Sequence, residues 1–145
     1  MLPGFVSRRS IIDPWLVGLS AVMLVGCGGG SDVAHVRGNV LYKDGTVPKG
    51  GVRIVRFEPT ETSPAKTRQP AGGAITEDGS FELSTRKPGD GIFLGEYAVT
   101  FTVWKAPREP ISLIKEEYTQ AATTPYKVTV DGDRDDLVFE IEPLK

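Results

Sequence analysis

Strict alternation of apolar and polar side chains is the feature that most constrains the fold of this chain. It is longest in residues 95–105, which read Gly-Glu-Tyr-Ala-Val-Thr-Phe-Thr-Val-Trp-Lys. A period of two is that of an extended strand, whose successive side chains point to opposite faces of a sheet. Because this strand is long and rich in β-branched residues, we expect it to be central, with Phe101 in the core. Its apolar face consists of Tyr97, Val99, Phe101 and Val103.

Six shorter segments alternate in the same way and are bounded by turn residues. Gly and Pro, at 17 and 11 of the 145 residues, favour turns over long helices. The alternation lapses between Pro107 and Pro125, where residues 113–118 have room for a single helical turn. Seven short strands at this spacing predict an all-β fold, a seven-stranded antiparallel Greek-key sandwich of two sheets. The six shorter strands are expected at 36–42, 51–58, 73–76, 80–84, 126–130 and 137–141.

Short connections between these strands predict two hairpins, 73–84 and 126–141. In the strand at 51–58, Val55 and Phe57 are expected to point inward, and the opposite parity of Val52 and Ile54 indicates a bulge or burial on both faces. Residues 60–71 hold no aromatic or large aliphatic side chain and are expected to form a solvated loop.

The N-terminus has the pattern of an export signal. Arg8 and Arg9 precede an apolar stretch, residues 15–26, which is too short to span a bilayer comfortably and has the length of a signal-peptide core. We expect residues 1–26 to be a signal helix that is removed. The two arginines supply the charge for general secretion, and residues 7–12 also resemble a twin-arginine export motif, which Asp13 fits poorly.

The signal ends in a four-residue motif, Leu24-Val25-Gly26-Cys27, that resembles the lipobox of bacterial lipoproteins. Cys27 is the only cysteine of the chain. Acyl chains on this thiol, at ~0.8 kcal/mol per buried CH₂, would hold the protein on a membrane of the cell envelope. We therefore expect a lipidated Cys27 and a Gly-rich tether over residues 27–34. The alternatives are a small residue near an ordinary cleavage site and a buried free thiol.

The order of strand and turn motifs after the tether is specific, although each motif is weak. The motifs are Val36-x-Gly38-x-Val40-x-Tyr42-x-Asp44-Gly45, Val55-x-Phe57-x-Pro59, Thr76-x-Asp78-Gly79-x-Phe81-x-Leu83, Gly89-Asp90-Gly91 and Gly95-Glu96-Tyr97-x-Val99. In this order, residues 35–145 resemble the carboxypeptidase regulatory-like domain, a transthyretin-like sandwich. Small lipoproteins of planctomycete-type bacteria that carry this domain alone are similar in detail. The resemblance implies an extracytoplasmic accessory or binding domain with no catalytic residues and no defined ligand.

Candidate catalytic residues are few. Nucleophilic catalysis needs a base beside a Ser or Cys, and the only histidine, His35, lies close to the tether. One class of enzyme with a transthyretin-like fold, the hydroxyisourate hydrolases, has a His-Arg-His set and a C-terminal Tyr-Arg-Gly-Ser. This chain has one histidine and ends in Glu-Pro-Leu-Lys, so it does not resemble that enzyme class. One Cys and one His also exclude a His/Cys zinc site built from this chain. We expect no enzymatic activity and no cofactor.

An acidic segment, residues 131–136, is the one candidate for metal binding. Asp131, Asp133 and Asp135, with Glu142, fall at positions 1, 3, 5 and 12 of an EF-hand-like calcium loop. Asp136 occupies position 6, where the sharp turn needs Gly, and the strand expected at 137–141 carries Glu142 away. We expect a solvated turn without a metal; a calcium-stabilised adhesion domain is the alternative.

The charge balance and one tryptophan indicate the class of partner that the chain could bind. With 17 Lys+Arg against 19 Asp+Glu, the chain has no basic excess of the kind that binds nucleic acid. Trp104 lies on the polar parity of the strand at 95–105, so either residues 106–125 cover it or it forms an exposed recognition patch for a protein or glycan. We expect a membrane-anchored lipoprotein with a non-catalytic β-sandwich module; a carbohydrate- or peptide-binding accessory domain is the alternative.

Overall fold

The computed structural model describes residues 32–145. The signal peptide (1–26) and the motif Leu24-Val25-Gly26-Cys27 lie outside the described residues, as does most of the tether. Within 32–145 the regular elements are strands and one 3₁₀ helix, which confirms the all-β class. The elements are β1 (Val33–Ala34), β2 (Val36–Tyr42), β3 (Val52–Pro59), β4 (Ala71–Ala74), β5 (Ser80–Glu82), β6 (Ile92–Phe93), β7 (Gly95–Ala106), β8 (Glu109–Ser112), η1 (Glu116–Thr119), β9 (Lys127–Val130) and β10 (Arg134–Ile141).

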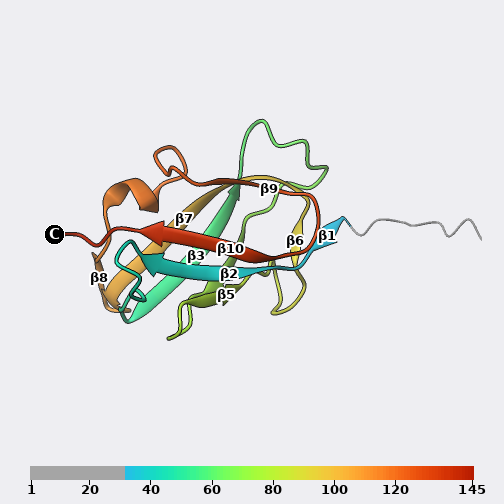
Figure 1. Cartoon of the computed structure of the whole chain (residues 1–145). Helices are drawn as coiled ribbons and strands as arrows, with labels where there is room; N and C mark the ends of the chain where they lie inside the picture. Colours follow the sequence, from blue (N-terminus) through green and yellow to red (C-terminus); the bar gives the residue numbers. More distant parts are fainter. Residues whose placement is uncertain (1–31) are drawn as a thin grey trace, which may run out of the picture.

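Two sheets form the body of the domain. One has the order β4-β3-β7-β8, with β9 also paired to β7, and the other has the order β10-β2-β5. Figure 1 shows β10, β2 and β5 in front of β3 and β7. The short β1 and β6 pair with each other at one end of the domain, and the C-terminus lies at the opposite end (Figure 1). No helix in 32–145 is both long enough and apolar enough to cross a membrane.

The strand β7 is central, as its alternation predicts. One of its edges pairs with β3 from Tyr97↔Pro59 to Trp104↔Val52, and its other edge pairs with β9 near its start and with β8 near its end. Its inward face is buried, with Phe101 only 1% exposed. The pairing of β3 with β7 runs without a register shift, so the bulge considered for β3 does not form. Ile54 instead lies on the outer face, 40% exposed.

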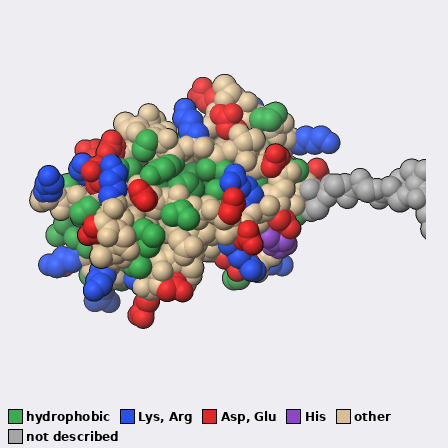
Figure 2. All heavy atoms as spheres, viewed as in Figure 1, with side chains coloured by type: hydrophobic (Ala, Val, Ile, Leu, Met, Phe, Trp, Pro, Cys, Tyr) green, Lys and Arg blue, Asp and Glu red, His purple; other side chains and the backbone are tan. Residues whose placement is uncertain are grey.

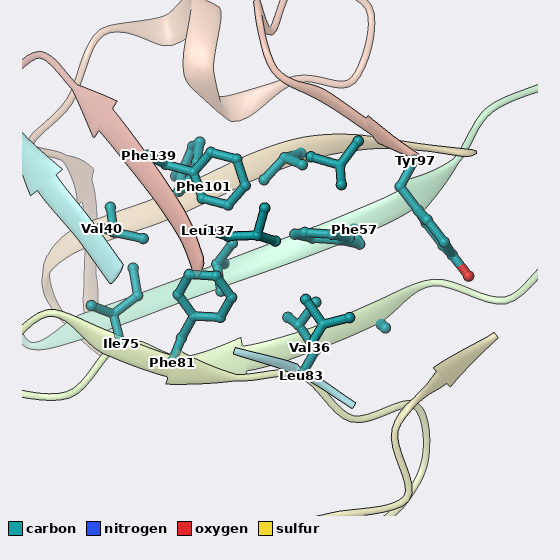
Figure 3. Close-up of a cluster of buried hydrophobic side chains, with 14 of the residues drawn as sticks. Val36, Val40, Phe57, Ile75, Phe81, Leu83, Tyr97, Phe101, Leu137 and Phe139 are labelled. Carbon is teal, nitrogen blue, oxygen red and sulfur yellow. The ribbon is translucent and has the colours of Figure 1, made fainter. Parts of the chain in front are cut away.

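Aromatic rings from both sheets meet in the core around Phe139 of β10 (Figure 3). Its ring centroid lies 5.5 Å from that of Phe101 on β7 and 6.0 Å from that of Phe81 on β5. The ring of Phe57 on β3 lies 6.2 Å away in an edge-to-face arrangement. Such pairs stabilise a fold beyond the area they bury, so Phe139 joins the two layers.

The predicted hairpin at 73–84 forms only in part. β4 pairs with β3 in one sheet and β5 pairs with β2 in the other, so the chain passes between layers. The two strands still meet where Gly72 and Ser84 exchange backbone hydrogen bonds, both 3.0 Å. Their close approach requires glycine, because a Cβ on Gly73 would lie 2.2 Å from the carbonyl oxygen of Glu82.

The predicted hairpin at 126–141 is wrong. β9 pairs with β7, whereas β10 pairs in parallel with β2, for example Phe139 with Val40. A hairpin of β9 with β10 would bury the same faces of these strands as the observed pairing does. Alternation alone therefore does not distinguish the two pairings. The acidic segment therefore crosses from one sheet to the other. The backbone N–H of His35 donates a hydrogen bond of 2.8 Å to Asp133 Oδ1 and fixes this crossing. The expectation of purely antiparallel sheets is therefore wrong for the pair β10 and β2.

The segment after β8 joins the C-terminus beside the core. Lys115 N donates to the carbonyl of Glu142, and Leu144 N donates to the carbonyl of Leu113. The ammonium of Lys115 lies 2.5 Å from Glu142 Oε2, and this contact raises the pKa of Lys115 and lowers the pKa of Glu142. The helical turn predicted at 113–118 appears slightly later, as η1, and it buries Tyr118.

Candidate functional site

Trp104, the predicted recognition residue, is half-buried. It lies on the outer face of β7, paired with Val52 of β3 on one side and with Ser112 of β8 on the other. The segment after β7 therefore flanks this tryptophan without burying it. Ile54 on the same face and Ile111 of β8 are 40% and 54% exposed. Val52 pairs directly with Trp104, and Ile54 lies two positions further along β3, so these apolar side chains are neighbours on the outer face.

The acidic residues of the calcium hypothesis do not gather into a site. In the part of the chain that the structure describes, no three His, Cys, Asp or Glu residues lie close enough together to hold a metal ion. Asp133 accepts the hydrogen bond from His35, and Asp136 pairs with the Arg134 guanidinium at 3.1 Å, which lowers the pKa of Asp136. Glu142 follows the far end of β10, where it pairs with Lys43 and Lys115.

Charges on the face of β10, β2 and β5 are mixed. Figure 2 shows acidic and basic side chains interspersed over this face, with no extended basic surface. Two ion pairs of this kind are Arg37 with Glu82, 3.3 Å apart, and Arg134 with Asp136. Mixed surface charge of this kind does not make the basic stripe that nucleic acids require.

A cleft that sequence reasoning missed lies at the end of the domain where β1 begins. Its volume is about 310 Å³. Asp32, Lys66 and Asp131 contribute charge to its lining. The apolar residues that line it are Pro64, Ala65, Phe93, Leu94 and Val130. The cleft is thus an apolar hollow bordered by both signs of charge, which is the general character of small-ligand sites.

One wall of the cleft belongs to the loop at 60–71, which is less solvated than expected. Ser63 is only 2% exposed, and its Oγ accepts a hydrogen bond of 2.9 Å from the backbone N–H of Glu96. A Cβ on Gly95 would lie 2.6 Å from the same Oγ. The loop therefore packs directly on the start of β7, and its residues after Ser63 are held beside the cleft.

A second wall of the cleft is formed where β1 pairs with β6. Phe93 pairs with Val33, and Leu94 N donates to the carbonyl of Asp32 at 2.9 Å. The hydroxyl of Tyr97 donates to the carbonyl of Phe93 at 2.6 Å, and burial raises the pKa of Tyr97, so the donor proton is retained at neutral pH. Asp32, the first described residue, is thereby fixed to the wall of the cleft.

Four segments that are distant in the sequence meet at this cleft: the start of the domain, the loop after β3, the junction of β6 and β7 (residues 93–95), and the end of β9. None of them carries a residue pattern typical of a ligand site. The one local signal in these segments is Gly95, a glycine at the first position of the most regular strand, β7.

No protein-family model matches the sequence, and no curated protein matches it significantly. Among solved structures, the chain is similar to the crystal structure of a DUF3823 family protein from Parabacteroides merdae, at 16% sequence identity and a TM-score of 0.46. The match covers 78% of this chain and 47% of that chain, so this protein spans about half the length of the matched one.

Proposed function

We propose that the protein is a cell-envelope lipoprotein, held on a membrane by acyl chains on Cys27, whose β domain is a non-catalytic binding or structural module. The observation that carries this proposal is the spacing between anchor and fold. The only cysteine ends a lipobox-like motif after a signal-like apolar stretch, and the first strand begins at Val33, six positions later. Two or more acyl chains make such an anchor effectively permanent.

The module, in this proposal, is a seven-stranded Greek-key sandwich of the carboxypeptidase regulatory-like, transthyretin-like class. Seven strands that overlap the ranges expected from the sequence support it: β2, β3, β4, β5, β7, β9 and β10. They lie in two layers, β10-β2-β5 and β4-β3-β7-β9. The parallel pairing of β10 with β2 is the point at which the arrangement departs from a purely antiparallel sandwich.

The proposal assigns the module no chemistry of its own. His35 is exposed, and its backbone rather than its ring makes the contact with Asp133. Acylation would occupy the one thiol of the chain. A module of this kind acts by holding a partner or a ligand near the membrane.

Mass spectrometry of the protein extracted from its native membrane tests the anchor. We expect a mature N-terminus at Cys27 that carries the mass of a diacylglyceryl group. A variant with Cys27→Ser should lose the anchor and appear as unprocessed precursor or as soluble protein, while near-ultraviolet circular dichroism shows an intact core. An unmodified peptide that spans Cys27 in the wild-type protein contradicts the proposal.

A further inference from the structure

We propose that the cleft beside β1 receives part of an acyl chain of a zwitterionic phospholipid in the membrane that holds the protein. This inference rests on the proposed anchor at Cys27. It adds a second lipid contact, made by the folded domain itself, and it orients the domain with β1 toward the bilayer.

The cleft lies at the end of the domain to which the anchor is attached. Asp32 lines the cleft and is fixed there by the hydrogen bond from Leu94 N. Cys27 precedes Asp32 by five positions, and a fully extended chain of that length spans at most about 18 Å. The acylated thiol therefore keeps the cleft within that distance of the bilayer surface. The C-terminus lies at the other end of the domain (Figure 1).

The lining of the cleft is largely apolar. Phe93 and Leu94 are only half-buried, and they face the cleft together with Pro64, Ala65 and Val130. Apolar surface that borders water gains stability when hydrocarbon covers it. A volume of about 310 Å³ is at the lower end of the range of ligand sites, so the cleft has room for part of one chain and not for a whole lipid.

The charged side chains that line the cleft are of both signs. Lys66 can pair with a lipid phosphate, while Asp32 and Asp131 can pair with an ammonium group. A phosphatidylethanolamine head group carries both partners. An anionic head group without an amine leaves the two carboxylates facing like charge, so the cleft should prefer the zwitterionic lipid.

Photocrosslinking tests this inference on the mature lipoprotein reconstituted in vesicles. The probe is a phosphatidylethanolamine with a diazirine in its acyl tail, present as a trace in vesicles of phosphatidylethanolamine and phosphatidylcholine. Peptide mapping after photolysis should find the lipid on residues 64–67 and 93–94. The same reactive tail on phosphatidylglycerol should label these residues less. Asp131→Asn removes one of the two carboxylates that favour the ammonium group, so it should reduce the preference for phosphatidylethanolamine.

Two matched substitutions separate the cleft from the rest of the surface. Thr129 lines the cleft and is exposed, and Thr123 is exposed outside it. Thr129→Trp should fill part of the cleft and remove most of the labelling, whereas Thr123→Trp should leave it unchanged. Labelling that is spread evenly over the domain, or that survives in Thr129→Trp, overturns the inference. If the protein is acylated and bound to vesicles but its cleft is not labelled, the inference about the cleft is overturned and the proposed anchor stands. If Cys27 is not acylated, both the inference and the proposed anchor are overturned.

Discussion

The hydroxyl of Tyr126 makes hydrogen bonds to both backbone groups of Glu140: it donates to the carbonyl oxygen at 2.5 Å and accepts from the N–H at 3.1 Å. Tyr126 directly precedes β9 in one sheet, and Glu140 belongs to β10 in the other. β10 is an edge strand, so one side chain takes the place of a neighbouring strand at this position. The Tyr126 ring also packs edge-on against Phe101 and Phe139.

We expect Tyr126→Phe to destabilise the domain by about 1 kcal/mol, because it keeps the ring contacts and removes two hydrogen bonds at a solvent-accessible edge. Urea unfolding measures this change. The variant should also associate more readily at high concentration, because the edge of β10 is no longer capped. Tyr42→Phe is the matched control, since within residues 32–145 the Tyr42 hydroxyl has no pair of backbone partners like that of Tyr126. Equal losses in both variants would contradict this role for Tyr126.

The inward parity of β7 gives a second prediction. Phe101 is 1% exposed and contacts Phe139 and Tyr126, whereas Thr102 is half-buried on the outer face. Phe101→Ala should cost ~3–5 kcal/mol through lost transfer energy and the cavity left behind. Thr102→Ala should cost well under half of that. Denaturant unfolding of the two variants compares them directly, and similar small losses would show that Phe101 is not a core residue.

Strand positions were predictable because each strand has one buried face, and the alternation of its side chains records that face. β2, β3 and β7 lie within one or two residues of their predicted ranges. The two-residue strands β1 and β6 are too short to show a period. β8 contains Pro110 and has mostly exposed side chains, so no buried face marks it in the sequence.

Strand partners were not predictable from the same pattern. The inward faces of β9 and β10 contain Val128, Val130, Leu137 and Phe139 whether the two strands pair with each other or with different sheets. What decides the pairing is long-range contact, such as that of Phe139 with the rings of Phe57 and Phe101. The cleft was missed for the same reason, because its walls come from four separate segments.

Close packing between β4 and β5 predicts a strong difference between two glycines. A Cβ on Gly73 would meet backbone atoms of Glu82 on β5, whereas a Cβ on Gly132 has nothing within 4 Å. Gly73→Ala should destabilise the domain by about 1–3 kcal/mol, because backbone atoms on two sheets must move apart. Gly132→Ala should be close to neutral. Thermal unfolding of the two alanine variants distinguishes them, and a neutral Gly73→Ala would show that the two strands separate without cost.

For calcium, we expect no stoichiometric site. The carboxylate of Asp133 is engaged by His35 N, and that of Asp136 by Arg134. Calorimetry with calcium chloride should therefore detect no site tighter than ~100 μM, which is well within the range that calcium loops reach. A shift of the melting temperature by calcium that disappears in Asp133→Ala would restore the adhesion-domain alternative.

The turn at 76–80 should make stability depend on pH in the acid range. Asp78 accepts hydrogen bonds from the hydroxyl of Thr76 and from the hydroxyl and backbone N–H of Ser80, the latter two at 2.7 and 3.0 Å. These bonds, that of Thr76 first, lower the pKa of Asp78 to about 2, below the usual value of about 3.9. The folded state thus binds this proton more weakly than the unfolded state does.

The contribution of Asp78 to stability is therefore complete above a pH of about 4 and is lost as the pH falls toward 2. Asp78→Ala should be less stable than the wild type at pH 6, and the difference should shrink at pH 2.5, where the wild-type carboxylate takes up its proton on unfolding. Glu77→Ala, at the exposed neighbouring position, is the control and should show no such convergence. Urea unfolding at the two pH values measures both differences. If the free energies of unfolding of the wild type and Asp78→Ala differ by the same amount at pH 6 and at pH 2.5, the ionised carboxylate does not stabilise the turn.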